Sequence, residues 1–169
     1  MDKHFELTDK FIINAFGAKL FQIKCTRKIK YADIGDLGGY IEKEDNLSGD
    51  AWVYGNAWVY GNARVSGNAQ VCGDAWVCGD AWVYGNAWVS GDAWVSNDNE
   101  HCGFDCFGSA NRHTHSYKTK SGKIEITCGC FRGSIEEFEK QIKETHRGNE
   151  FERQYMAIVE VIKIKFGLK

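Results

Sequence analysis

Six side chains between residues 109 and 132 carry groups that commonly bind a small anion. They are Ser109, Asn111, Arg112, Thr114, His115 and Arg132. An arginine guanidinium holds a phosphate or a carboxylate through two parallel hydrogen bonds, and nearby hydroxyl and amide groups add further contacts. We therefore predict a ligand-binding site at these residues and no catalytic residues. The alternative interpretation is a polar loop that fixes this segment to the rest of the chain.

The same segment contains cysteine and histidine side chains, which are typical ligands of zinc. The cysteines concerned are Cys102, Cys106, Cys128 and Cys130. Their spacings, Cys-x₃-Cys and Cys-x-Cys, differ from the Cys-x₂-Cys of common zinc sites. We expect no cofactor. A structural zinc held by these four cysteines is the alternative, and so is a pair of cysteines at the end of a buried strand.

A six-residue repeat, Val-x-Gly-Asn/Asp-Ala-x, fills the middle of the chain and must position the segment that follows it. Four residues of each unit alternate as in a β-strand, and the Gly-Asn/Asp pair provides a turn. Alanine and valine then share an inner face on which nothing is larger than valine. The unit is too short for a helical repeat, which needs 20 residues or more. The pattern begins at Ile41 and ends at Ser96.

Stacking three units in one coil of about eighteen residues predicts three faces, whose strands lie about 4.8 Å apart from coil to coil. All six tryptophans then point outward. One face carries Trp52, Gln70 and Trp88, and another carries Arg64 and Trp82. The remaining face carries Trp58, Trp76 and Trp94 with Tyr60. An aromatic face of this size is usually covered in soluble proteins. We expect it to be an oligomer face, in a trimer or a dimer; the C-terminal helices are the alternative cover.

Three parts follow from this pattern: an N-terminal β cap over residues 1–40, a β-helix over 41–98, and a C-terminal α+β module over 99–169. In the last part we expect strands at 113–119 and 123–128, joined at "KSGK". A capping box of Ser134 with Glu137 then begins a helix that ends at Gly148. Its apolar stripe, and that of a second helix over 150–165, should face the module's core. The stripes are Ile135, Phe138 and Ile142, and Tyr155, Ile158, Val159 and Ile162.

The hexads resemble the hexapeptide-repeat left-handed β-helix, a triangular prism with three hexads per coil. Across nearly the whole chain, "GDLGGYIEKEDNLS", "GSANRHTH" and "CGCFRGSIEEFEKQIKETH" resemble a family of phage and prophage proteins often described as YdcK-like transferases. The resemblance implies a mainly β fold, a left-handed parallel β-helix of about three coils. A phage origin would place the protein in the cytoplasm of the host cell.

Hexapeptide acyltransferases use a histidine as a general base beside a loop that leaves the β-helix. Here no histidine lies between Phe5 and Glu100, and no loop interrupts the hexads. An acyl-CoA-dependent acyltransferase therefore remains only as an alternative function, one that would depend on His113 or His115. The β-helix itself is weak evidence for a reaction, because one fold serves many functions.

The composition bears on whether the protein binds nucleic acid or a membrane. The formal net charge is −2 and the pI is about 6.2, so no basic surface favours nucleic acid. No apolar run has the length of a membrane span, and the N-terminus does not resemble a signal peptide. We expect a cytoplasmic, non-enzymatic homo-oligomer. Its function would be to antagonise a host defence, by sequestering a nucleotide-like ligand or by binding an effector protein.

Overall fold

The computed structural model describes residues 3–168, which divide into two compact units, the first ending at Asp98 and the second beginning at Asn99. The first unit is built from eleven strands, most of them two residues long. They are β1 (Phe5–Ile13), β2 (Lys19–Cys25), β3 (Leu37–Ile41), β4 (Trp52–Val53), β5 (Trp58–Val59), β6 (Arg64–Val65), β7 (Gln70–Val71), β8 (Trp76–Val77), β9 (Trp82–Val83), β10 (Trp88–Val89) and β11 (Trp94–Val95). The 3₁₀ turn η1 (Glu44–Asn46) lies between β3 and β4, and a second, η2 (Asp98–Glu100), follows β11.

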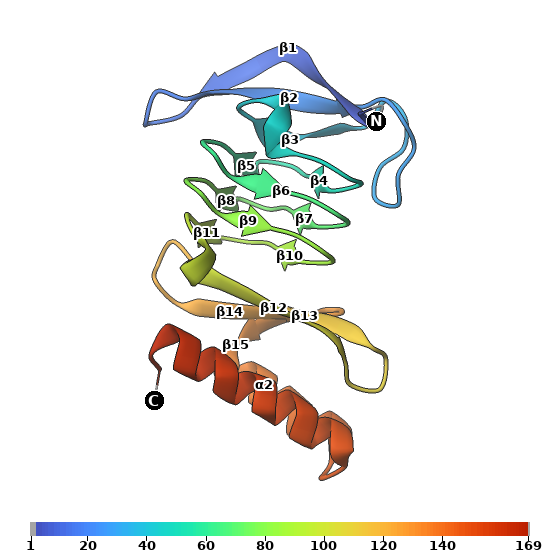
Figure 1. Ribbon diagram of the computed structural model, residues 1–169, viewed down its shortest axis with the longest axis vertical. Helices are drawn as coiled ribbons and strands as arrows, with labels where there is room; N and C mark the ends of the chain where they lie inside the picture. Colours follow the sequence, from blue (N-terminus) through green and yellow to red (C-terminus); the bar gives the residue numbers. More distant parts are fainter. Residues whose placement is uncertain (1–2, 169) are drawn as a thin grey trace. The chain divides into compact units, whose positions relative to one another are not determined.

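The hexads wind into a β-solenoid of about three coils, as the repeat predicts (Figure 1). Strands one coil apart pair in parallel to give the stacks β3-β5-β8-β11, β4-β7-β10 and β6-β9. Each residue pairs with the residue eighteen positions on, as in Trp58 with Trp76 and Arg64 with Trp82. Ile41 pairs with Val59 and Leu47 with Val65, so the first coil begins where the sequence pattern begins. The prediction of a mainly β, solenoid fold is confirmed.

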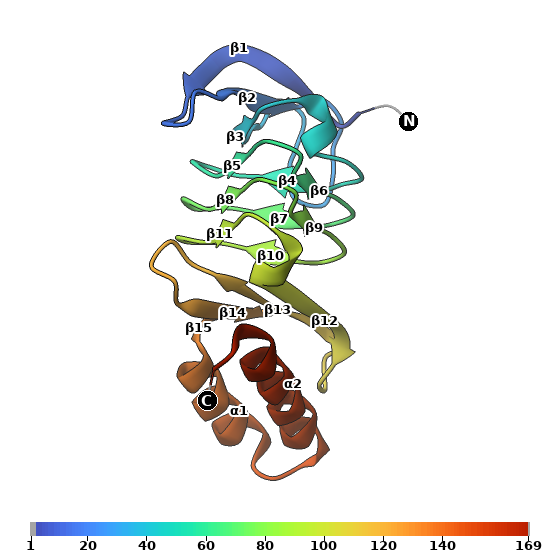
Figure 2. The ribbon, with the colours of Figure 1, turned by 60° about the vertical axis from the view of Figure 1, so that its left-hand side comes forward.

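The interior of the solenoid is a column of small apolar side chains. Every valine and alanine at the inner positions from Ala51 to Val95 is at most 2% exposed. Backbone hydrogen bonds join successive coils, for example from Trp58 N to Ala75 O at 2.9 Å. Asparagine and aspartate side chains continue the stacking at the corners, where Asn56 donates to Asp74 at 3.2 Å. Figure 2 shows the resulting stack from a second side.

The strands β1 and β2 form an antiparallel hairpin at one end of this stack (Figure 1). β3 pairs with β2 on one side and with β5 on the other, so one sheet continues from the hairpin into the coils. This hairpin and the loops beside it cover the first coil. Trp52 is therefore only 1% exposed, packed beside His4 at a ring distance of 5.9 Å. Trp52 occupies an outer position of the coil, as the repeat predicts, but the N-terminal segment covers it, so it is not part of the exposed surface.

The second unit contains a four-stranded antiparallel sheet and two helices. Its elements are β12 (His101–Phe107), β13 (Arg112–Lys118), β14 (Ile124–Cys128), β15 (Phe131–Ser134), α1 (Ile135–His146) and α2 (Glu150–Phe166). The sequence predicted the hairpin β13–β14 but missed the outer strands β12 and β15. These lack an alternating pattern of apolar residues: β12, "HCGFDCF", is mostly exposed, and β15, "FRGS", has four residues.

Both helices begin and pack as predicted. Ser134 accepts from Glu137 N at 3.2 Å, and the Glu137 carboxylate accepts from Ser134 N at 2.8 Å, which completes the capping box. The two apolar stripes lie in one core with Ile126 and Cys128 of the sheet. The helices therefore cover one face of the sheet, and the other face carries the histidines of β12 and β13.

The corner glycines of the solenoid show how closely successive coils approach one another. Gly73 has a φ of 70°, and a Cβ there would lie 2.9 Å from Gly91 N of the next coil. Gly17, in the hairpin turn, has a φ of 83° and open space around it. We predict that Gly73→Ala lowers the free energy of unfolding by about 2–4 kcal/mol, because the new Cβ would press against the next coil and alanine also disfavours a positive φ. Gly17→Ala should cost about 1–2 kcal/mol, from the conformation alone. Urea unfolding monitored by tryptophan fluorescence measures both, and equal losses would contradict tight stacking.

Candidate functional site

The predicted ligand-binding residues fall in four separate places in the second unit. Ser109 and Asn111 are exposed in the turn between β12 and β13, where Asn111 has a φ of 47°. The turn is held to α2, because Gly108 N donates to the Gln154 side chain at 3.0 Å. Arg112 follows the turn and lies along Gly129, where a Cβ would lie 2.7 Å from the arginine Nη1. Ser109 and Asn111 thus lie on an exposed turn, and Arg112 begins β13 directly after it.

Thr114 and His115 lie on opposite faces of β13 and are both buried. The Thr114 hydroxyl donates to Cys128 Sγ at 3.3 Å, on the face that the helices cover. The Cys128 thiol lies 3.8 Å from the Tyr155 hydroxyl, and burial raises the pKa of Tyr155 to about 12. His115 lies on the other face. Arg132, on β15, is bound instead to Glu125 at 2.9 Å. The six residues do not converge on one ligand.

The cysteines proposed as zinc ligands are also separated. Cys102 lies 3.0 Å from the Ser116 hydroxyl, and burial raises the pKa of its thiol. Cys128 is buried against the helices, whereas Cys106 and Cys130 are exposed. Within residues 3–168, no three or more His, Cys, Asp or Glu side chains are arranged to hold a metal ion. None of the seven cysteines forms a disulfide with another.

Three histidines gather on the face of the sheet opposite the helices. His101 Nδ1 lies 3.0 Å from His115 Nε2, and His113 Nδ1 lies 2.6 Å from a carboxylate oxygen of Asp105. The rings of His113 and His115 are 5.7 Å apart. His101 and His115 thus hydrogen-bond to each other, and His113 hydrogen-bonds to Asp105 beside them. His113, His115 and Tyr117 alternate along β13 and therefore share this face, where the rings of His115 and Tyr117 lie 5.9 Å apart.

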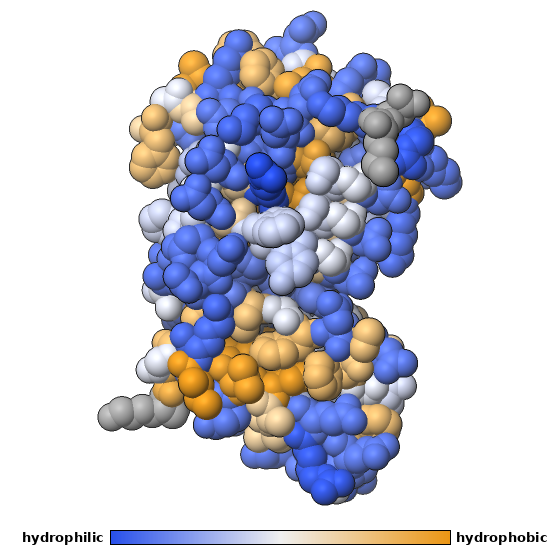
Figure 3. Space-filling view, viewed as in Figure 1, coloured by the Kyte–Doolittle hydropathy of each residue, from blue (hydrophilic) through white to orange (hydrophobic). Residues whose placement is uncertain are grey.

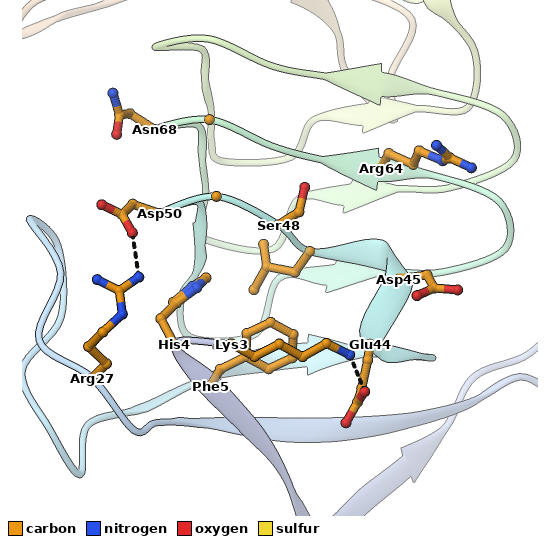
Figure 4. Close-up of a pocket in the computed structure, with 13 residues that line it drawn as sticks. Lys3, His4, Phe5, Arg27, Glu44, Asp45, Ser48, Asp50, Arg64 and Asn68 are labelled. Atoms are coloured by element: carbon orange, nitrogen blue, oxygen red, sulfur yellow. Dashed lines mark hydrogen bonds and ion pairs between the residues drawn. The ribbon is translucent and has the colours of Figure 1, made fainter. Parts of the chain in front are cut away.

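A large groove lies elsewhere, in the first unit, between the N-terminal segment and the first two coils (Figure 4). Its volume is about 1020 Å³. The charged side chains around it are Lys3, Arg27 and Arg64, and Glu44, Asp45 and Asp50. Lys3 pairs with Glu44, and Arg27 pairs with Asp50 at 2.9 Å. Both pairs join the N-terminal segment to the solenoid.

Arg64 differs from the other two cations of the groove. It is exposed, and it makes no ion pair with any residue in the described part of the chain. Figure 4 shows Arg64 and Arg27 at opposite ends of the groove. Arg64 also borders a second, smaller hollow of about 290 Å³, which Asn62, Asp80, Trp82 and Asp98 line with it. One guanidinium therefore lies at the edge shared by two neighbouring hollows.

Next to Arg64, one coil further on, an exposed indole is held in a fixed position. Trp82 is the residue paired with Arg64, and its side chain is 51% exposed. The indole N–H donates to the Ser66 hydroxyl at 3.2 Å, and Tyr84 packs beside the ring at 5.5 Å. Tyr84 is itself 60% exposed. This surface, Arg64 with Trp82 and Tyr84, is called the Arg64 face below.

Sequence reasoning did not single out this groove, because it depends on contacts between residues far apart in the chain. Lys3 and Arg27 reach it only through the fold of the N-terminal segment. One signal was available, however. The position after alanine is tryptophan in six of the eight hexads, and the exceptions are Arg64 and Gln70. Of these two exceptions, Arg64 is the one that adds a charge to the outer surface of the coils.

The predicted oligomer face is a column of aromatic side chains on the β3-β5-β8-β11 sheet. The rings of Trp58 and Trp76 stack in parallel at 4.8 Å, as the coil spacing predicts. The next step differs, because Trp76 and Trp94 meet edge to face at 6.4 Å. Trp58, Trp76 and Tyr60 are half-buried, and Trp94 is 40% exposed. Stacking thus hides part of each ring within the column itself.

His4, between the groove and Trp52, gives the first unit a response to pH. It is buried, and its Nε2 lies 2.9 Å from the Ala51 carbonyl oxygen. Burial lowers the pKa of His4 below its usual value of 6.5. The unfolded chain then binds this proton more readily than the folded one, so the stability contributed by neutral His4 is present above about pH 6.5 and is lost as the pH falls below it.

We predict that wild-type protein loses more unfolding free energy than His4→Gln between pH 7.5 and pH 5, in parallel urea titrations. Equal losses would mean that His4 does not titrate differently on folding.

Comparison with known proteins supports the solenoid. The family model of the YdcK beta solenoid repeat matches three overlapping segments of the regular coils, residues 57–73, 69–85 and 81–97. No curated protein matches the chain. Among the described residues, no helix is long and apolar enough to cross a membrane. The part of the chain from 57 to 97 is therefore similar to a β-solenoid repeat of the YdcK kind.

Proposed function

We propose that this protein binds a small anionic ligand with an aromatic ring, a nucleotide or a close analogue, on the Arg64 face, and holds it without transforming it. The observation that carries the proposal is the position of Arg64. It is an exposed guanidinium without an ion-pair partner in residues 3–168, at the edge of a groove of about 1020 Å³. Its neighbour along the solenoid is an exposed indole.

The charge arrangement supports an anion at Arg64 and not at the other cations of the groove. Arg27 and Lys3 are paired with carboxylates of the solenoid, so an incoming phosphate would have to replace those contacts. Arg64 forms no ion pair within residues 3–168, so an anion there would displace no such contact, while the carboxylates of Asp80 and Asp98 line the neighbouring hollow. A guanidinium offers two parallel N–H donors to a phosphate, which gives the contact a defined direction. The hydroxyl of Ser48, also in the groove, is available as a further donor.

The exposed rings of Trp82 and Tyr84 are the reason to expect an aromatic ring in the ligand. Parallel strands of successive coils lie about 4.8 Å apart. A ring stacked on Trp82 is therefore close enough for its attached phosphate to reach Arg64. The hydrogen bond to Ser66 fixes the indole before a ligand arrives, so little side-chain freedom is lost on binding. Bases stack on exposed aromatic side chains in many nucleic-acid-binding proteins, with about 1–3 kcal/mol per base.

The biological role that we propose is antagonism of a host defence by a phage or prophage protein, through removal of a nucleotide-like signal. Support for this step comes from the resemblance of nearly the whole chain to phage and prophage proteins. An effector protein bound at the same surface is the second form of this role. The protein would act as a homo-oligomer in the cytoplasm. A rigid stack of coils suits such a role, because it holds the Arg64 face in one shape.

Substitutions on the Arg64 face test the binding site. We predict that Arg64→Ala and Trp82→Ala each weaken nucleotide binding by about tenfold or more, from the lost charged hydrogen bonds and the lost stacking. Isothermal titration calorimetry with a panel of mononucleotides and cyclic dinucleotides measures this effect. Citrate and sulfate serve as anions without a ring and should bind more weakly.

Trp94→Ala is the matched control, because Trp94 is also an exposed tryptophan of the outer positions but lies on another face. The Trp94→Ala variant should bind nucleotides with the same affinity as the wild type. Equal effects of Trp82→Ala and Trp94→Ala, or no binding by any nucleotide, would contradict the proposal. Turnover of an acyl-CoA that depends on His113 or His115 would instead favour the acyltransferase.

A further inference from the structure

The helix α2 has two apolar faces, and only one of them lies in the core. Tyr155, Ile158, Val159 and Ile162 pack against the sheet and α1. On the opposite side, Ala157, Val161 and Ile164 are exposed. Val161 is 49% exposed and Ile164 is 70% exposed. Figure 3 shows an apolar area on this side of the second unit, over the helix that Figure 1 labels α2.

The outer residues have the spacing of a coiled-coil seam. Ala157, Val161 and Ile164 are separated by four and three residues, which corresponds to heptad positions d, a and d. Leu168, just after the C-cap Gly167, is 45% exposed and extends the apolar surface. Two charged residues border the seam on opposite sides. Glu160 is at position g and Lys165 is at position e, and both are exposed.

We propose that this seam, defined by Ala157, Val161 and Ile164, binds the same seam of a second copy of the chain, with the two α2 helices parallel. This contact is separate from the ligand site on the Arg64 face and does not depend on it. It also differs from the aromatic column, which the sequence favoured as the oligomer face.

The charges beside the seam select a second copy and set its direction. In a parallel pair, a residue at position g lies beside the e residue five positions later in the partner helix. Glu160 and Lys165 have this spacing, so the dimer contains the pair twice. In an antiparallel pair, g residues face g residues and e residues face e residues. Glu160 and Lys165 would then lie on different sides of the seam and could not pair.

The size of the seam sets the expected affinity. Two helical turns of apolar contact bury less than the roughly 1,600 Å² of a standard protein interface. The helix is already folded against the sheet, so association does not have to pay for helix formation. We therefore expect a reversible dimer with a dissociation constant of about 1–100 µM.

Sedimentation velocity of the full chain over a range of concentrations tests the contact. Ile164→Asp should weaken association by about tenfold or more, because it places a charge in the centre of the seam. Ile34→Asp is the matched control: Ile34 is 71% exposed and lies in the first unit, so this change should leave association as in the wild type. A wild-type monomer at all concentrations would overturn the proposal. So would an oligomer unchanged by Ile164→Asp but disrupted by Trp94→Asp.

An exchange of charges tests the parallel direction. Glu160→Lys alone and Lys165→Glu alone should each weaken self-association, by about tenfold, because like charges then meet across the seam. A mixture of the two variants should form a heterodimer as tight as the wild-type dimer, since lysine at 160 and 165 of one chain then faces glutamate in the other. Two variants that still associate with themselves, or that fail to pair when mixed, would contradict the parallel arrangement.

Discussion

The geometry of the first unit depends on one constraint, the register of eighteen residues between coils. Inside the solenoid there is space only for alanine and valine, with Ile41 and Leu47 in the first coil. At the corners, glycines with positive φ allow the chain to turn while the next coil lies in direct contact. If one hexad were lengthened by a residue, every later side chain would change face, because side chains alternate along a strand. The uninterrupted repeat from Gly49 to Ser96 meets this requirement.

Register also explains how an outer surface can carry a function. A residue at one outer position lies beside the residue eighteen positions later, so Arg64 and Trp82 become neighbours without any loop to join them. The coil supplies the spacing, and the choice of side chain supplies the chemistry. Replacement of tryptophan by arginine at position 64 does not disturb the interior, because Val65 beside it remains buried. In this fold, the outer positions are free to change while the inner ones are not.

Much of the fold could be predicted from the sequence, because its signals are local and repeated. The hexads gave the coils and their three faces, and the capping box at Ser134 gave the start of α1. The burial of Trp52 was not predicted, since its cover comes from a segment almost fifty residues earlier. The strands β12 and β15 were missed because cross-strand pairing stabilises them, and their own residues show no alternation. The candidate site was harder for the same reason. Its groove requires Lys3 and Arg27 to lie beside the coils, which no spacing in the sequence indicates.

The most direct test of the binding site is a two-dimensional ¹H–¹⁵N NMR titration that follows the indole N–H signals. The chain has six tryptophans, so each signal reports one place on the first unit. The account predicts that a nucleotide shifts the Trp82 indole signal and the backbone signals near Arg64, while the Trp58, Trp76 and Trp94 signals stay in place. Shifts confined to the turn at 108–112 and to Arg132, with Trp82 unchanged, would contradict it. They would return the site to the C-terminal residues that the sequence suggested.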